Sequence, residues 1–319
     1  MTTYLQTPQS PQTLPPPALP YHRLALSSGQ HRWWRPLAGT CVVVVGVALA
    51  ALVVFAGGEV VGAVLDRPQD ADGFRQLGAL GDTAVALASL ALGLPVVLLA
   101  ARWAQRRPAG TVSSVTGRVR WAWLGRCLAL ALPLTGASFG IMVLLPEPAD
   151  GGGELAWAGL TPFLTGLAMV LLLVPFQAAA EEYAFRGWLV QAVGAWCRSP
   201  WVAVLPQALL FAAAHGWGTP WGFADLFVFA VVAAWLTIRT GGLEAAIALH
   251  VVTNLLPFGL MAGTTDGFAT DETAADMDWA TFAVDVPMVC LYAAAVLWLA
   301  GRRGQRTQAK ARAAGGHEG

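Results

Sequence analysis

The sequence predicts an all-α membrane protein, a polytopic bundle of about eight transmembrane helices. Of its 319 residues, 56% are hydrophobic and only 12% are charged, about half of the ~25% that is usual for a soluble domain. The mean hydropathy is +0.57, and a soluble chain of this size cannot bury so much apolar surface. The net charge is zero, so the basic surface typical of nucleic-acid binding is missing. We therefore expect contact with membrane lipid and no nucleic-acid partner.

Eight apolar segments follow one another along the chain, each with roughly the ~20 residues that a helix needs to cross a bilayer. They are 37–62, 79–101, 121–145, 157–197, 200–217, 222–239, 242–262 and 279–301. The fourth is too long for one crossing at ~1.5 Å per residue. We expect it either to project beyond the membrane or to break, with Pro175 as the candidate kink.

Two polar tails flank one membrane domain, which spans residues 37–301. We expect residues 1–36 to form a disordered tail, because they begin with a stretch rich in Pro, Gln, Ser and Thr. Residues 302–319 form a second, basic tail. All lysines and arginines except Arg67 and Arg75 fall on one side of the eight-span arrangement. The positive-inside rule then places both termini in the cytoplasm, and we expect the plasma (inner) membrane.

Ionisable groups inside membrane helices are costly, so each is a functional candidate. They fall into three clusters: Glu181-Glu182-Tyr-Ala-Phe-Arg186, Phe211-Ala-Ala-Ala-His215 and His250-Val-Val-Thr-Asn254. Glu182 and Arg186 are four residues apart and can pair on one helix face. Glu181 lies ~100° around the helix and has no partner in the sequence. A desolvated carboxylate of this kind is suited to act as a general base near neutral pH.

His250 and Asn254 also share a helix face, and together they offer two donors suited to a developing oxyanion. Glu181 lies 17 residues before Arg198 and His215 lies 17 after it, so in an antiparallel helix pair the two side chains can face each other. His250 lies nine residues beyond Gly241, about 13 Å into the membrane. If the hairpin around Arg198 protrudes by ~10 Å, the three clusters share one level in the cytoplasmic half.

With these three motifs intact and in order, residues 155–265 resemble the CPBP (Abi) family of intramembrane proteases, which includes the CAAX prenyl endopeptidases. The resemblance implies a protease-like domain over 37–301 that hydrolyses a peptide or protein substrate. It implies that Glu181 activates water, His215 holds that water, and His250 and Asn254 stabilise the tetrahedral oxyanion. Glu182 and Arg186 would be structural or would assist the site.

Several alternatives stay open from the sequence. No cofactor is expected, and a zinc-type HExxH motif is absent, but one glutamate with two histidines is also a possible ligand set for a divalent metal such as zinc. A non-catalytic membrane scaffold or an immunity-type protein of the same fold fits the same helices. A transporter would use Glu181, Asp225 and the histidines as a relay, but it predicts an inverted repeat that the sequence does not display. The oligomeric state is left open.

Overall fold

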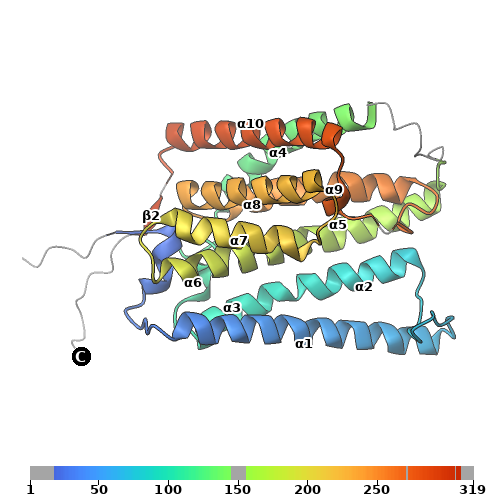
Figure 1. The fold of residues 1–319 in the computed structure, drawn as a ribbon, viewed down its shortest axis with the longest axis horizontal. Coiled ribbons are helices and arrows are strands. Elements are labelled where there is room, and N and C mark those ends of the chain that lie inside the picture. Colours follow the sequence, from blue (N-terminus) through green and yellow to red (C-terminus); the bar gives the residue numbers. More distant parts are fainter. Residues whose placement is uncertain (1–17, 145–155, 271, 306, 310–319) are drawn as a thin grey trace, which may run out of the picture.

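The computed structural model describes residues 18–144, 156–270, 272–305 and 307–309, and over these ranges the chain is an all-α bundle (Figure 1). The predicted fold class is thus confirmed. The α-helices are α1 (Arg35–Val64), α2 (Ala79–Ala91), α3 (Gly93–Trp103), α4 (Trp121–Leu144), α5 (Leu160–Glu182), α6 (Val190–Gly194), α7 (Pro200–Ala214), α8 (Pro220–Thr240), α9 (Glu244–Gly263) and α10 (Trp279–Arg302). Shorter helical turns are η1 (Tyr21–Leu26), η2 (Ala109–Thr111), η3 (Tyr183–Leu189) and η4 (Ala274–Asp276).

Seven of the eight predicted spans appear, in the described part of the chain, as helices long and apolar enough to cross a membrane. Two of them are composite: α2 and α3 together cover Ala79–Trp103, and α5, η3 and α6 cover Leu160–Gly194. The exception is α7, whose 15 residues extend only ~22 Å, less than the ~30 Å hydrocarbon core. It ends early because the chain turns away at Gly216, where φ is +98°.

The long fourth segment neither stops nor breaks at Pro175. The helix α5 continues through this proline, and the winding changes only at Tyr183, where the π-helix η3 begins directly after the two adjacent glutamates. Hydrogen bonds in a π-helix run from i to i+5, and such segments are rare and often occur at functional sites. The fourth segment therefore does depart from regular α-helix, but the departure is a π-helix beside Glu181 and Glu182 and not a kink at Pro175.

The helix α9 lies in the interior of the bundle. It packs against α5 on one side and α4 on another and also contacts α8, while α10 covers α4 and α8 (Figure 1). Every residue from Glu244 to Val252 is buried, and small side chains such as Ala245, Ala246 and Ala248 allow the neighbouring helices to approach closely. This packing places His250 inside the protein, away from the lipid-facing surface.

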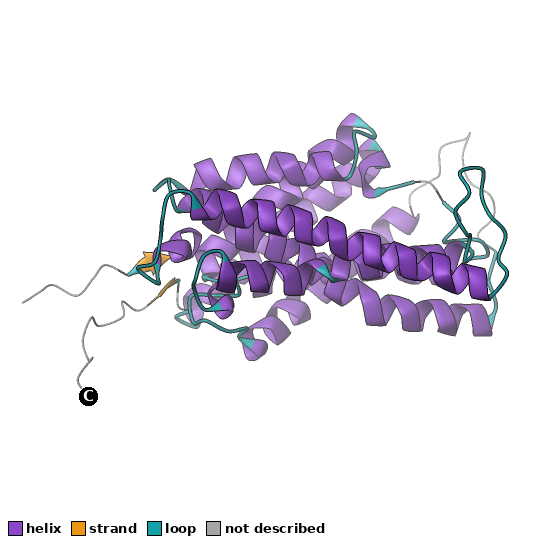
Figure 2. Ribbon diagram, turned by 90° about the horizontal axis from the view of Figure 1, so that it is seen from below, coloured by secondary structure: helices purple, strands orange, loops and turns teal. Residues whose placement is uncertain are grey.

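The two ends of the described chain meet at one end of the bundle. Strand β1 (Leu19–Pro20) pairs antiparallel with β2 (Gln308–Ala309) (Figure 2), and η1 packs against α6. We call residues 19–26 the N-terminal hook. Tyr21 and Leu24 in the hook are buried, and the Tyr21 hydroxyl donates a hydrogen bond to the carbonyl oxygen of Val112.

The hook corrects the expectation of a disordered tail over 1–36, since its aromatic and aliphatic side chains join the core; residues 1–17 lie outside the described residues. In the same way, part of the predicted basic tail 302–319 is ordered by pairing, because β2 lies within it. The fit between hook and bundle is close: a Cβ atom at Gly194 of α6 would lie 1.9 Å from the carbonyl oxygen of His22.

Acidification is expected to loosen the N-terminal hook. Burial lowers the pKa of His22 from its ordinary value of 6.5, and the charge of Arg23 acts in the same direction. The Nε2 atom donates to the carbonyl oxygen of Arg198 at 3.1 Å, while Nδ1 is buried without a hydrogen-bond partner in the described structure, so a proton bound there would have no acceptor. A released hook would bind a proton more readily than the docked one, so docking is favoured above pH 6.5 and weakens as the pH falls below it.

Hydrogen exchange of residues 19–26 between about pH 7.5 and about pH 5.5, corrected for the intrinsic exchange rates, would measure this effect. The variant His22→Gln keeps a donor but cannot be protonated, so its exchange should be independent of pH over this range. Equal protection of the wild-type hook at both pH values would contradict the prediction.

Candidate functional site

The predicted pair between Glu182 and Arg186 is formed at the junction of α5 and η3. The Nη1 atom of Arg186 lies 3.1 Å from Oε1 of Glu182, and both side chains are completely buried. The guanidinium group also stacks over the ring of Phe211 of α7 at 4.0 Å from its centroid and lies 5.4 Å from that of Phe229 of α8. The ion pair therefore connects the π-helical turn to two neighbouring helices.

His250 of α9 lies between the two glutamates. Its Nδ1 atom is 2.8 Å from Oε1 of Glu182, and its Nε2 atom is 3.7 Å from Oε2 of Glu181. Because a carboxylate can only accept hydrogen bonds, Nδ1 is the donor to Glu182. This bond fixes the orientation of the ring and leaves Nε2 facing Glu181.

Glu181 has a partner that the sequence analysis missed. The side-chain amide of Gln177, one helical turn earlier on α5, donates from Nε2 to Oε1 of Glu181. The other carboxylate oxygen, Oε2, is buried and has no hydrogen-bond partner among the described residues. The expectation of a partnerless carboxylate is therefore wrong for one of its two oxygens. Gln177 is uncharged and lies outside the three motifs, although it is four residues before Glu181, the spacing of neighbours on one helix face.

Asn254 contacts the same helix one turn away from His250. Its Nδ2 atom donates to Oε1 of Gln177 at 3.1 Å. As predicted, His250 and Asn254 project from one face of α9, and that face meets α5 at Glu181, Glu182 and Gln177. Two consecutive turns of α9 thus contact two consecutive turns of α5.

His215 stands apart from the hydrogen bonds and ion pairs that join Glu181, Glu182 and His250 in the described structure. It caps the C-terminus of α7, where Nδ1 donates to the carbonyl oxygen of Phe211 at 2.9 Å. Within the described ranges it makes no hydrogen bond or ion pair with Glu181 or Glu182, and its link to the site is through the ring of Phe211, which packs against both histidines. Equal residue counts predict equal height only for straight α-helices, whereas α5 continues into a π-helix.

Asp225, the acid that the transporter alternative adds to Glu181 and the histidines, makes no hydrogen bond or ion pair with this site among the described residues. Asp225 of α8 and Asp285 of α10 are buried elsewhere, and Asp285 accepts a hydrogen bond from Ser138 at 3.3 Å. In the described part of the chain, no three His, Cys, Asp or Glu side chains are grouped so that they could hold a metal ion. The possible ligand set of Glu181, His215 and His250 is therefore not assembled.

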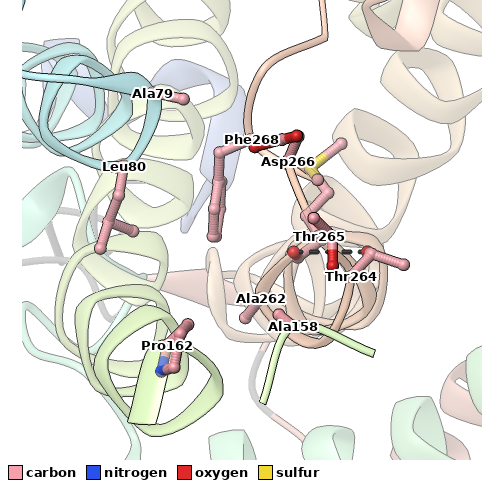
Figure 3. Close-up of a pocket in the computed structure, with 11 residues that line it drawn as sticks. Ala79, Leu80, Ala158, Pro162, Ala262, Thr264, Thr265, Asp266 and Phe268 are labelled. Carbon is pink, nitrogen blue, oxygen red and sulfur yellow. Dashed lines mark hydrogen bonds between the residues drawn. The ribbon is translucent and has the colours of Figure 1, made fainter. Parts of the chain in front are cut away.

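A cavity of about 300 Å³ lies elsewhere in the bundle, between α2, α5, the end of α9 and the loop that follows it. Figure 3 shows the side chains of Leu80, Pro162 and Phe268 around this space. None of the residues of the three sequence motifs lines it. It is therefore a feature separate from the cluster around Glu181.

Comparison with known proteins gives two matches. Residues 162–256 match the family model of the type II CAAX prenyl endopeptidases, Rce1-like, which confirms over this stretch the resemblance that the three motifs indicated. The chain is also 28% identical over 169 residues to the uncharacterized protein YyaK of Bacillus subtilis (strain 168), an alignment that covers 51% of this chain and 55% of the relative. The chain thus spans about half the length of that curated relative. No solved structure matches.

Proposed function

We propose, from the match of residues 162–256 to type II CAAX prenyl endopeptidases, that this chain is an intramembrane endopeptidase that hydrolyses peptide bonds with a water activated by Glu181. The observation that carries the proposal is the contrast between the two oxygens of this carboxylate. Oε1 accepts a hydrogen bond from Gln177, whereas Oε2 is buried, has no hydrogen-bond partner in the described structure and faces His250. A general base needs such an oxygen within reach of the proton it removes.

In the proposed reaction, Oε2 of Glu181 takes a proton from water, and the resulting hydroxide attacks the carbonyl carbon of the peptide bond. The charge that develops on the carbonyl oxygen is stabilised from α9 by the free N–H of Asn254 and by Nε2–H of His250, which requires that the ring carry a proton on Nε2 as well as on Nδ1. The proton held by Glu181 then passes to the departing amine, so the carboxylate is regenerated. Glu182 and Arg186 take a supporting part, because the hydrogen bond from Nδ1 to Glu182 fixes the ring of His250.

His215 has a less direct place in this proposal. The family resemblance gives it the role of holding the water, and its ring packs on Phe211, which in turn contacts His250. We propose that it borders the site from α7 and approaches the water only when a peptide is bound. The fixed groups of the mechanism are then those on α5 and α9.

The proposed substrate is a peptide or protein at the membrane, and the description of the matching family makes a prenylated CAAX peptide the first candidate to test. We also propose that both termini face the cytoplasm in the plasma membrane. The two ends of the described chain lie at one end of the bundle, and arginines such as Arg35 and Arg302 begin or end helices there. By helix lengths, the Glu181 cluster is nearer to this end than to the other.

Cells that contain either the wild-type protein or Glu181→Gln provide the test of the proposed function. Labelling of free protein amino termini followed by mass spectrometry should find new termini of membrane proteins in the wild-type cells that are missing from the variant. The two proteins must be present in the membrane at equal amounts. Identical sets of termini would contradict the proposal and would favour the non-catalytic scaffold of the same fold.

A further inference from the structure

We propose that Gln177 is a positioning residue of this site, which holds Glu181 so that Oε2 acts as the base and holds Asn254 so that one of its N–H groups remains free for the oxyanion. This inference rests on the proposed function. Gln177 belongs to none of the three sequence motifs, and only 4% of its surface is exposed. It is the one described side chain that hydrogen-bonds to both Glu181 and Asn254.

The ionised carboxylate determines the direction of both hydrogen bonds. An ionised Glu181 can only accept, so Gln177 must present its Nε2 group to Oε1. The carbonyl oxygen of the same amide then points to α9, where it can only accept, and Asn254 must therefore donate from Nδ2. The charge on Glu181 thus orients two amides in sequence, from α5 to α9.

The directions of these two hydrogen bonds give different roles to the two oxygens of Glu181 and to the two N–H groups of Asn254. The bond from Gln177 restrains Oε1, and the carboxylate can no longer rotate freely to exchange its oxygens. Oε2 is left toward His250, with 3.7 Å between it and Nε2. At Asn254 one N–H is used by Gln177, and the second N–H is available to a developing oxyanion. Displacing a reacting group by about 1 Å can lower a rate 10²-fold, so the restraint matters for the chemical step.

A purely structural role is the alternative for a buried glutamine between membrane helices, because amide side chains often hydrogen-bond across helices. The two roles differ in what they predict. An interhelical contact changes the stability of the bundle and the amount of folded protein. A positioning residue changes kcat of the folded protein while KM stays nearly constant, since the interaction matters mainly in the transition state.

The experiment uses full-length protein in lipid nanodiscs with an internally quenched reporter peptide that ends in a farnesylated CAAX sequence, and the same peptide without the farnesyl group. The variant Gln177→Met keeps the side-chain length and removes both hydrogen bonds. The matched control is Gln207→Met: Gln207 of the apolar helix α7 is also a buried glutamine, but its amide donates to the backbone oxygen of Ala230. Glu181→Gln is measured in the same assay.

We expect Gln177→Met to lower kcat, per folded protein, by about 10- to 100-fold with KM unchanged within about twofold, whereas Gln207→Met keeps the wild-type kcat. A Gln177→Met protein with wild-type kcat, or one whose loss only follows the folded fraction, would overturn the inference. If Gln177→Met does not fold, Gln177→Asn, which keeps an amide too short to reach both partners, takes its place with the same two outcomes.

The assay separates failure of this inference from failure of the proposed function. If Glu181→Gln is inactive while Gln177→Met cleaves at the wild-type rate, only the role of Gln177 is refuted. If Glu181→Gln cleaves like the wild type, or if the wild type cleaves neither reporter, both proposals fail together.

Discussion

The exchange of Glu181 for glutamine is expected to lower kcat for peptide hydrolysis by about 10²- to 10⁴-fold, the contribution typical of a general base. The substitution preserves the shape of the side chain, and its carbonyl oxygen can still accept the hydrogen bond from Gln177. The position of Oε2 is then taken by an amide nitrogen, which cannot accept the proton of water. The loss should therefore appear in the chemical step and not in the folding of the bundle.

Single-turnover cleavage of the reporter peptides, together with thermal unfolding of the same samples, would measure both quantities. The unfolding midpoint of Glu181→Gln should stay close to that of the wild type. Glu181→Asp, which keeps the carboxylate but withdraws it by about one methylene, should lie between the two in rate. Retention of wild-type kcat by Glu181→Gln would remove this residue from the role of base.

The largest effect on stability is expected when the buried ion pair is broken from one side. Glu182→Leu should destabilise the protein by about 3–5 kcal/mol, because it leaves the guanidinium of Arg186 charged and buried without its carboxylate. The burial of both side chains is complete, so solvent cannot replace the lost partner. The hydrogen bond to His250 is lost as well, which adds to the cost.

A double-mutant cycle with Arg186→Met tests this explanation. The double variant should be more stable than the sum of the two single effects predicts, because it removes both charges together. Reversible unfolding in mixed micelles gives the free energies. The pair of the half-buried Arg75 with the fully exposed Asp66, with 3.8 Å between the charged atoms, serves as the control, and Asp66→Asn should leave stability unchanged. Equal effects at the two pairs would contradict the argument.

Much of this site could be predicted from helical spacing alone. The i, i+4 rule correctly paired Glu182 with Arg186 and placed His250 and Asn254 on one face of α9, because these relations depend only on the geometry of a single helix. Seven of the eight apolar segments likewise appear as helices long enough to cross a membrane in the described structure, because helix length and apolar composition are local properties of the sequence. The polar residues are concentrated in the fourth to seventh apolar segments. The interior position of α9, which carries His250 and Asn254, agrees with this.

What the sequence did not predict depends on departures from regular helix or on contacts between distant segments. The equal residue counts on either side of Arg198 assume two straight α-helices, whereas α7 ends at Ala214 and α5 changes its winding at Tyr183. Gln177 carries no charge, so it lacks the signal that marks an ionisable group within an apolar segment. The N-terminal hook is held by Tyr21 and Leu24 in contacts with residues far along the chain, which local composition cannot reveal.

The π-helix η3 affects the orientation of the continuous helix that α5, η3 and α6 form together. A π-turn contains one residue more than the α-turn it replaces, and one residue corresponds to about 100° of rotation. α6, which follows η3, therefore presents to its neighbours a different face from the one that an uninterrupted α-helix would present. On that face Gln191 receives Arg107 at 2.6 Å, and Gly194 meets the hook. The extra residue thus sets the rotation of α6, which contacts the N-terminal hook, relative to α5, which carries the two glutamates.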